Sequence, residues 1–228
     1  CSSHLTADEL IEAKFDEIII ATGITPRKIE VPGINHTKVL SYIEVLQQHK
    51  PIGNKVAIIG AGGIGFDVAE FLLHDNSKIH NKHSFLQEWG IDETLTHRGG
   101  IMPNIKIEQP IRQIYLCQRS TGKMGKRLGK TTGWIHRANL KKHGVKMLSA
   151  VNYTKIDDNG LHYMQNGKHE VLDVDNIIIC AGQDSNNSLA WELQQKNIKT
   201  HTIGGAFLAL ELDAKFAINQ GVRLALTL

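Results

Sequence analysis

A glycine string after a short apolar run constrains the fold of this chain more than any other feature. Residues 55–59 (KVAII) lead into residues 60–65 (GAGGIG), which have the form G-x-G-x-x-G. Apolar residues then recur at helical spacing, so the glycines connect a strand to a helix. Such a turn predicts a dinucleotide site in an α/β fold. The alternative is a glycine-rich turn in an ordinary α/β protein.

Each position of the glycine string has a physical role in the predicted site. Gly60 permits a sharp turn, Gly62 lets a pyrophosphate approach the backbone, and Gly65 lets the helix pack closely on the strand. Gly63 and Ile64 lie between them, at the helix N-terminus that faces the negative charge.

Length and composition narrow the class of protein. The chain has 228 residues, of which 41% are hydrophobic, so it can form one large domain or two small ones. No apolar run approaches the roughly 20 residues that span a bilayer, and no basic and then apolar leader opens the chain. We expect a cytoplasmic protein without a membrane partner, in which Cys117 and Cys180 are buried, reduced thiols.

Metal and nucleic-acid binding are not expected. The three cysteines form no C-x-x-C motif, and the 12 histidines show no metal-ligand spacing. Basic residues are frequent between 119 and 146, but aromatic residues are not interleaved as a nucleic-acid platform requires. This segment is either a solvated face or a pocket for a phosphate-rich cofactor.

The remaining chain predicts alternating strands and helices. Ser41 and Glu44 form a possible capping box for a helix through His49. Thr131 or Thr132 can cap another helix that runs to about His143. Further strands are expected at 15–20, 113–118 and 145–151, and further helices at 63–74 and about 213–226. A long polar stretch, about 76–111, is expected to be a surface insertion, because βα and αβ connections usually have about 2–6 residues.

The pattern changes after residue 151. The turn signals DDNG (157–160) and QNG (165–167) predict a meander of short strands. The following segment 176–180 (NIIIC) resembles 15–20 (FDEIII), and both are followed by small residues and a glycine. We interpret this similarity as a sign that both segments belong to one sheet, which the chain leaves near residue 23 and rejoins near residue 182.

Two long strings carry a more specific resemblance. Residues 89–92 (WGID) and 128–137 (LGKTTGWIHR), together with 203–205 (IGG) and 211–214 (ELDA), closely resemble the C-terminal part of the bacterial NADPH-dependent 2,4-dienoyl-CoA reductases. The resemblance covers essentially the whole chain. These proteins are two-dinucleotide flavoprotein reductases, in which a nicotinamide domain is inserted into a flavin domain.

The resemblance implies a Rossmann-like NADP-binding domain inserted into an incomplete FAD-binding α/β domain. The expected segments are 1–50 and 175–228 for the FAD-binding domain and 51–174 for the NADP-binding domain. The implied cofactors are NADP(H) and FAD, with an incomplete FAD site. FMN and a 4Fe-4S cluster are expected only in a missing N-terminal domain, which would be the partner of this chain. No catalytic residue and no metal ligand are expected within these 228 residues.

A basic residue at the end of the second strand indicates which nucleotide is bound. Arg119 lies where a dinucleotide fold contacts the adenosine ribose, and arginine there accommodates the 2′-phosphate of NADP. Ser120 and Lys123 could add a hydroxyl and a second cation. The alternative for Arg119 is an exposed surface charge. Trp134 either stacks on adenine or closes the core, and His136 is expected to be structural.

The flavin side of the site is implied by the resemblance alone. One group lies at strand ends, where the backbone would approach the flavin and nicotinamide: Thr22, Gly23, Ala181 and Gly182. A second group lies where a helix N-terminus would favour the anionic or carbonyl edge of the cofactor: Gly204, Gly205 and Glu211. The alternative for the residues near 22 and 181 is a tight turn at a strand end.

Together these features predict an electron-input module that binds NADPH and passes hydride to FAD, for reduction of a 2,4-dienoyl-CoA in unsaturated fatty-acid β-oxidation. Two alternatives remain open. One is a module that binds NADP(H) and senses redox state without catalysis. The other is a reductase of the same fold that acts on another enone or an amine.

Overall fold

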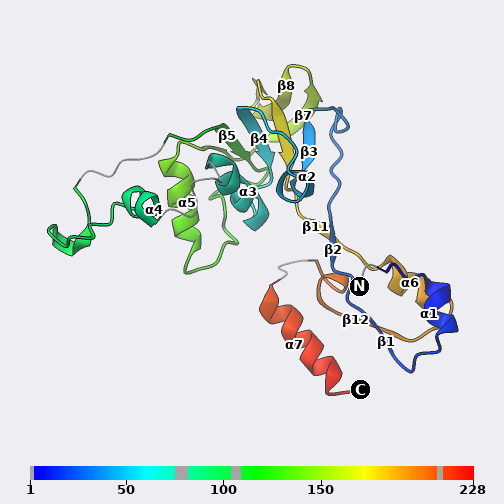
Figure 1. Cartoon of the computed structure of the whole chain (residues 1–228). Helices are drawn as coiled ribbons and strands as arrows, with labels where there is room; N and C mark the ends of the chain where they lie inside the picture. The colour runs from blue at the N-terminus through cyan, green and yellow to red at the C-terminus, as the bar shows by residue number, and fades with distance from the viewer. Residues whose placement is uncertain (1–2, 75–81, 104–108, 210–212) are drawn as a thin grey trace. The chain divides into compact units, whose positions relative to one another are not determined.

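A computed structural model describes residues 3–74, 82–103, 109–209 and 213–228 (Figure 1). The chain divides into two compact units. The smaller unit contains Cys1–Arg27 and Gly182–Leu228, and the larger contains Lys28–Ala181. No helix among these described ranges has both the length and the apolar character needed to cross a membrane.

The larger unit is built on a five-stranded sheet in which every neighbouring pair is parallel. The strands, in their order across the sheet, are β3 (Val39–Ser41), β10 (Asn176–Ile179), β4 (Lys55–Ile59), β5 (Gln113–Cys117) and β6 (Lys146–Leu148). The strand that enters the glycine turn, β4, is therefore central. This arrangement confirms the α/β class with a parallel sheet.

Helices cover one face of this sheet. The helices are α2 (Tyr42–Leu46), α3 (Gly63–Leu73) and α5 (Gly133–Lys142). Val56 and Ile58 of β4 face them and are fully buried in one apolar cluster with residues of all three helices. Such alternation of side chains along a strand places the other residues of β4 on the opposite face.

Local signals set the ends of these helices. Ser41 and Glu44 form the predicted capping box, although α2 ends at Leu46 rather than at His49. Thr132 precedes α5 as expected, but its side chain makes no capping hydrogen bond. The backbone of Thr132 is already in the helical region, and the Gly133 N–H donates to the Gly129 carbonyl instead.

A three-stranded meander covers the opposite face of the sheet. Its antiparallel strands are β7 (Asn152–Asp157), β8 (Gly160–Gln165) and β9 (Lys168–Leu172), with β8 in the centre. Ala57 and Ile59 of β4 pack there with Leu161 of β8. Asn166 and Gly167 form the second turn with φ of 52° and 76°, values that the predicted turn chemistry favours.

The insertion between α3 and β5 contains packed structure in the residues that are described. It holds the helix α4 (Lys82–Glu88), the 3₁₀ turn η2 (Arg98–Gly100) and a bridge between Ile91 and Ile101. Residues 75–81 and 104–108 lie outside the described part. The described part of the insertion is therefore partly helical and is not only a polar loop.

Two contacts organise the insertion. Asp92 is buried and accepts hydrogen bonds from Thr94, Thr96 and His97, and these hydrogen bonds, with Thr94 first, hold its pKa well below the ordinary value. Lys142 of α5 donates to the backbone carbonyl of Glu88 and lies 5.6 Å from the centre of the Trp89 ring. The second contact fixes the end of α4 on α5.

The smaller unit contains two short two-stranded sheets and three α-helices among its described residues. β1 (Ile18–Ile20) pairs in parallel with β12 (Thr200–Thr202), and β2 (Ile24–Pro26) pairs antiparallel with β11 (Gln183–Ser185). The helical elements are α1 (Ala7–Glu12), α6 (Ser188–Gln195), η3 (Gly204–Ala206) and α7 (Ala214–Ala225). An apolar cluster that includes Ile20 and Leu193 forms the core of this unit.

The similarity between residues 15–20 and 176–180 does not reflect a shared sheet. β10 pairs with β3 and β4, where Ile178 lies between Leu40 and Ile58, whereas β1 pairs with β12 in the other unit. A run of isoleucines is the common pattern of buried parallel strands and does not identify a partner. The chain nevertheless passes between the two units at Arg27 and Ala181, close to the expected residues 23 and 182. The expected segment ends at 50 and 174 stay predictions.

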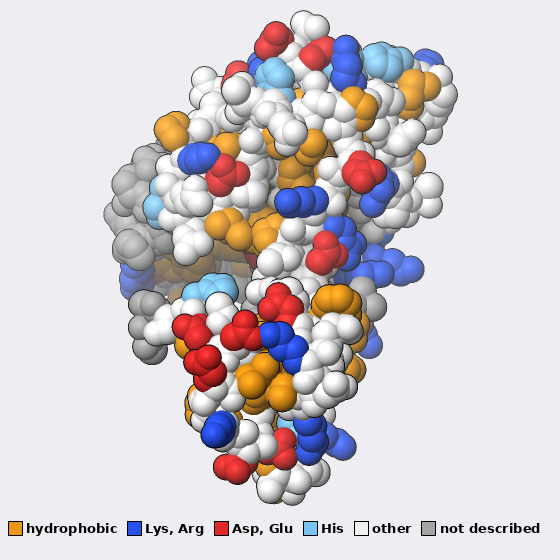
Figure 2. Space-filling model, turned by 90° about the vertical axis from the view of Figure 1, so that its right-hand side faces the viewer, with side chains coloured by type: hydrophobic (Ala, Val, Ile, Leu, Met, Phe, Trp, Pro, Cys, Tyr) orange, Lys and Arg blue, Asp and Glu red, His pale blue; other side chains and the backbone are white. Residues whose placement is uncertain are grey.

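The face displayed in Figure 2 carries charges of both signs. Lysine and arginine side chains lie there among aspartate and glutamate side chains rather than forming a continuous basic area. A non-specific nucleic-acid surface requires a positively charged groove that follows the backbone. Among the described residues on this face, that pattern is absent.

Candidate functional site

Two glycines of the turn after β4 pack against backbone. Gly60 has φ of +116°, and a Cβ there would lie 2.1 Å from the Cys180 carbonyl oxygen beyond β10. The Gly60 N–H donates to the Cys117 carbonyl of β5 at 2.9 Å. A Cβ at Gly65 would lie 1.8 Å from the Gly60 oxygen. Only glycine fits at either position, so the turn holds α3 close to the carboxyl ends of three strands.

The other two glycines face open space. A Cβ at Gly62 or at Gly63 would meet no atom within 4 Å. Gly62 is the N-cap of α3 and offers no side-chain cap, and the first amides of a helix have no acceptor within the helix. Ile64 is partly buried and packs its side chain against the helix-covered core. The turn therefore offers amide donors and a positive helix end to an anion.

Arg119 lies two residues beyond β5, at the same edge of the sheet as the glycine turn. Its side chain is exposed, and among the described residues it has no carboxylate or hydrogen-bond partner. The Gln118 amide donates to the carbonyls of Ser120 and Gly122, which holds this loop in shape. Ser120 and Lys123 are also exposed. An unpaired guanidinium on a braced loop is available to an external anion.

The residues predicted on α5 have different environments. Trp134 is 62% exposed, so the expectation that it closes the core is wrong. Stacking of Trp134 on adenine stays a prediction. The Nδ1 atom of His136 lies 3.1 Å from the Glu70 carboxylate, to which Asn139 also donates at 3.2 Å. These bonds join α5 to α3 and support a structural role for His136.

Two of the glycines predicted on the flavin side lie next to strand ends with positive φ. Gly23 and Gly182 have φ of +78° and +99°, which favours glycine. The Thr22 hydroxyl donates to the Asn186 carbonyl in the smaller unit. Ala181 ends the larger unit and packs beside the meander-covered core. Both the tight-turn interpretation and a close approach of a cofactor fit these conformations.

A hollow in the smaller unit adjoins the remaining predicted residues. It measures about 410 Å³ and is lined by Ala21, Ile203, Gly204, Gly205, Asp213, Ala214 and Ala217. Gly204 has φ of +62° and donates its N–H to the Gln220 side chain at 2.7 Å. Asp213 caps α7 by accepting from the Phe216 N–H. Glu211 lies outside the described residues.

The two described cysteines do not provide a reactive thiol. Cys117 and Cys180 are free and buried, as expected from the sequence. Burial raises the pKa of each thiol to about 12, so the nucleophilic thiolate is scarce near neutral pH. Neither cysteine is therefore a candidate nucleophile.

Comparison with known proteins agrees with this geometry. Residues 2–217 match the family described as pyridine nucleotide-disulphide oxidoreductase. The chain is 27% identical over 198 residues to a metal reductase of Desulforamulus reducens, covering 86% of this chain and 28% of that protein. It is 25% identical over 193 residues to a cinnamate reductase of Clostridium sporogenes, covering 84% and 24%.

Solved structures support the same fold. A 2-naphthoyl-CoA reductase in complex with 2-naphthoyl-CoA superimposes with a TM-score of 0.74 at 20% identity, covering 100% of this chain and 29% of that one. The chain thus spans between 24% and 29% of the length of these three proteins. The chain belongs to the pyridine nucleotide-disulphide oxidoreductase family and is a flavin and pyridine-nucleotide oxidoreductase module.

Proposed function

We propose that this chain is the electron-input module of an NADPH-dependent 2,4-dienoyl-CoA reductase that acts in unsaturated fatty-acid β-oxidation. The larger unit binds NADPH and the smaller unit contributes part of an FAD site. An N-terminal domain outside this chain carries FMN, a 4Fe-4S cluster and the substrate site. The resemblance of residues 89–92 and 128–137 to these reductases supports this choice over a redox sensor or a reductase of another enone or amine.

The glycine turn is the observation that carries the proposal. Gly60 and Gly65 hold the turn against backbone, while Gly62 and Gly63 leave open space in front of the first amides of α3. A pyrophosphate fits this cradle because it accepts several hydrogen bonds and carries negative charge toward a positive helix end. NADPH supplies the hydride, and the protein binds and orients it.

Arg119 determines the choice between the two nicotinamide nucleotides in this proposal. NADPH differs from NADH by its 2′-phosphate, so the preference must come from groups that contact that phosphate. A guanidinium donates two parallel hydrogen bonds to phosphate and stays charged at any working pH. Ser120 and Lys123, exposed on the same loop, can add a hydroxyl and a second charge.

The smaller unit is assigned to FAD on weaker geometric grounds. The hollow beside Gly204 and Gly205 lies at the N-terminal end of α7, where a helix favours an anionic or carbonyl group. FAD accepts hydride and passes electrons onward. Thr22, Gly23, Ala181 and Gly182 would let the flavin or nicotinamide approach backbone closely.

Calorimetric titration with NADPH and NADH tests the nucleotide assignment. A charge-assisted hydrogen bond contributes roughly 1.5–3 kcal/mol, so Arg119→Ala should weaken NADPH binding by about one to two orders of magnitude. NADH affinity should stay nearly unchanged. Arg98→Ala, which removes an exposed arginine from η2, is the matched control. Equal losses for both nucleotides in Arg119→Ala would show that Arg119 supports the fold instead.

The substrate is tested with the full-length protein that contains this chain. NADPH oxidation that depends on added 2,4-dienoyl-CoA supports the proposal. Four closely spaced cysteines after a barrel in the upstream coding sequence would agree with it. A signalling or DNA-binding domain upstream, without dienoyl-CoA-dependent oxidation, would favour the redox sensor.

A further inference from the structure

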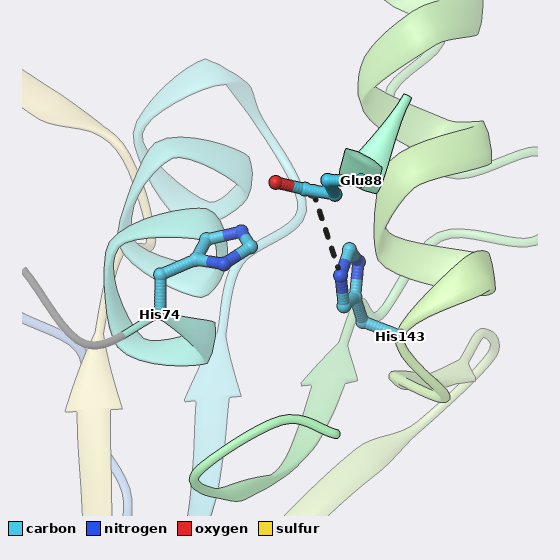
Figure 3. Close-up of side chains that lie close together, drawn as sticks. All are labelled: His74, Glu88 and His143. Carbon is cyan, nitrogen blue, oxygen red and sulfur yellow. Dashed lines mark ion pairs between the residues drawn. The ribbon is translucent and has the colours of Figure 1, made fainter. Parts of the chain in front are cut away.

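Three helix ends in the larger unit bring two histidines and a carboxylate together. His74 follows α3, Glu88 is the last residue of α4, and His143 follows α5. Figure 3 shows the three side chains directed toward a common space, and their ligand atoms all lie within 4.8 Å of one another. The two imidazole rings meet edge to face with centroids 5.0 Å apart. The proposed NADPH and FAD sites use none of these residues.

His143 has a buried nitrogen without a hydrogen-bond partner. Its side chain is 1% exposed, and Nδ1 lies 2.9 Å from the Asn139 carbonyl oxygen. A carbonyl only accepts, so Nδ1 carries the hydrogen and Nε2 of the neutral ring presents its lone pair. Among the described residues Nε2 has no hydrogen-bond partner, and Glu88 Oε1 lies 3.7 Å away. With the ring neutral, Nε2 and Oε1 are two acceptors that face each other, and a cation between them would satisfy both.

The surroundings of His143 match those of a metal ligand. Metal-binding histidines usually donate their second ring N–H to a carbonyl or carboxylate, as His143 does to Asn139. The C-terminal ends of α3 and α5 also direct negative partial charge toward the same space. This attraction for a cation comes from the helix ends and does not depend on the tautomer of the His143 ring.

Two described basic side chains that line a hollow together with His143 are engaged elsewhere. Lys142 donates to the backbone carbonyl of Glu88 and lies over the Trp89 ring. Arg112 donates to the Leu72 carbonyl at 3.1 Å and to the Gly53 carbonyl at 3.2 Å. Among the described residues, the Glu88 carboxylate forms its ion pair with His143 and with neither of these two cations. That carboxylate is free to bind a metal ion.

We propose that His74, Glu88 and His143 bind one zinc ion, with water in the fourth position. Two imidazoles and one carboxylate suit Zn²⁺, which binds them at about 2.0–2.2 Å in a tetrahedron. Ligand atoms of such a site lie roughly 3.3–3.5 Å apart. The 3.7 Å between His143 and Glu88 needs only a small movement, and His74 and Glu88 are partly exposed and can rotate. The ion would fix α4 of the insertion to α3 and α5.

Zinc titration of the 228-residue chain, freed of metal and of any affinity tag, tests the site. Calorimetry should give one equivalent of Zn²⁺, and Co²⁺ should show the strong visible absorption of tetrahedral coordination. Mg²⁺, which prefers oxygen ligands, should not compete. His74→Gln and Glu88→Gln should each weaken zinc binding at least about tenfold. Zinc should also slow protease cleavage within residues 82–103.

His169→Gln is the matched control, because His169 is exposed and lies 5.5 Å from the His162 ring rather than at the helix ends. It should bind zinc as the unaltered chain does. His143→Gln removes the buried ligand. If that variant does not fold, the variants at the partly exposed positions, His74→Gln and Glu88→Gln, decide the result. Unchanged zinc affinity in both His74→Gln and Glu88→Gln would overturn the proposal. A loss in His169→Gln alone would place the ion at the other histidine pair and overturn it as well.

Discussion

Alanine at Gly65 is expected to destabilise the larger unit, whereas alanine at Gly62 is expected to leave the fold intact and weaken NADPH binding. A Cβ at Gly65 would lie 1.8 Å from the Gly60 oxygen and 2.9 Å from its carbonyl carbon. These are backbone atoms that cannot rotate away, so α3 itself must move. Overpacking of this kind costs about 1–3 kcal/mol, and the gain in helix propensity offsets at most about 1 kcal/mol.

The situation at Gly62 is the reverse. A Cβ there would meet no protein atom within 4 Å, and φ of −85° with ψ of −172° is open to alanine. The free energy of unfolding should therefore change by less than about 1 kcal/mol. The added methyl group occupies the space proposed for the pyrophosphate. Loss of one charge-assisted hydrogen bond, about 1.5–3 kcal/mol, would weaken NADPH binding roughly 10- to 150-fold.

Urea unfolding and NADPH calorimetry on the same preparations separate these effects. Gly221→Ala is the control, because Gly221 lies in the middle of α7 with open space around it. It should unfold no more easily than the unaltered chain and bind NADPH equally well. Normal NADPH affinity in Gly62→Ala would refute the pyrophosphate assignment. Normal stability in Gly65→Ala would refute the packing argument.

Two further predictions concern charge. The NADPH preference proposed for Arg119 should shrink at high salt, because the side chain is exposed to solvent; calorimetry at two salt concentrations measures this. Hydrogen bonds from Lys50 and then from Ser41 lower the pKa of Glu44 from 4.5 to about 2, so the ionised carboxylate stabilises the fold above about pH 4.5 and this contribution is lost as the pH falls through about 2. Glu44→Gln should therefore unfold about 1 kcal/mol more easily at pH 7 in urea titrations, and a difference that persists unchanged near pH 2 would contradict the assignment.

Local sequence signals predicted much of the fold because their physics is local. The capping box at Ser41 and Glu44 and the Asn166-Gly167 turn depend on a few neighbouring residues. The strand and helix around Gly60 were predicted for the same reason, since the glycine spacing and the apolar periodicity lie in one short segment.

Strand pairing was harder to predict because it depends on residues far apart in the sequence. The isoleucines of β10 indicate a buried strand but do not identify its neighbours. The cluster of His74, Glu88 and His143 was not predicted for a related reason. Its members are 14 and 55 residues apart in the sequence and come from three helices. Metal-ligand spacing in a sequence identifies ligands that lie on one helix or loop, and these three residues do not.

The strands β3 and β10 also decide where the larger unit can be cut. A fragment of residues 28–181 retains them and should fold, whereas residues 51–174 lack both and should not. The shorter fragment loses five buried aliphatic side chains, Val31, Leu40, Val45, Ile177 and Ile178. Each contributes about 2–5 kcal/mol when truncated in a core, which together rivals the 5–15 kcal/mol stability of a typical domain. It also loses the Cys180 carbonyl against which Gly60 packs, so the turn itself is unsupported. Circular dichroism and NADPH calorimetry on both fragments measure the difference, and a folded 51–174 fragment that binds NADPH would show that β10 is dispensable to the site.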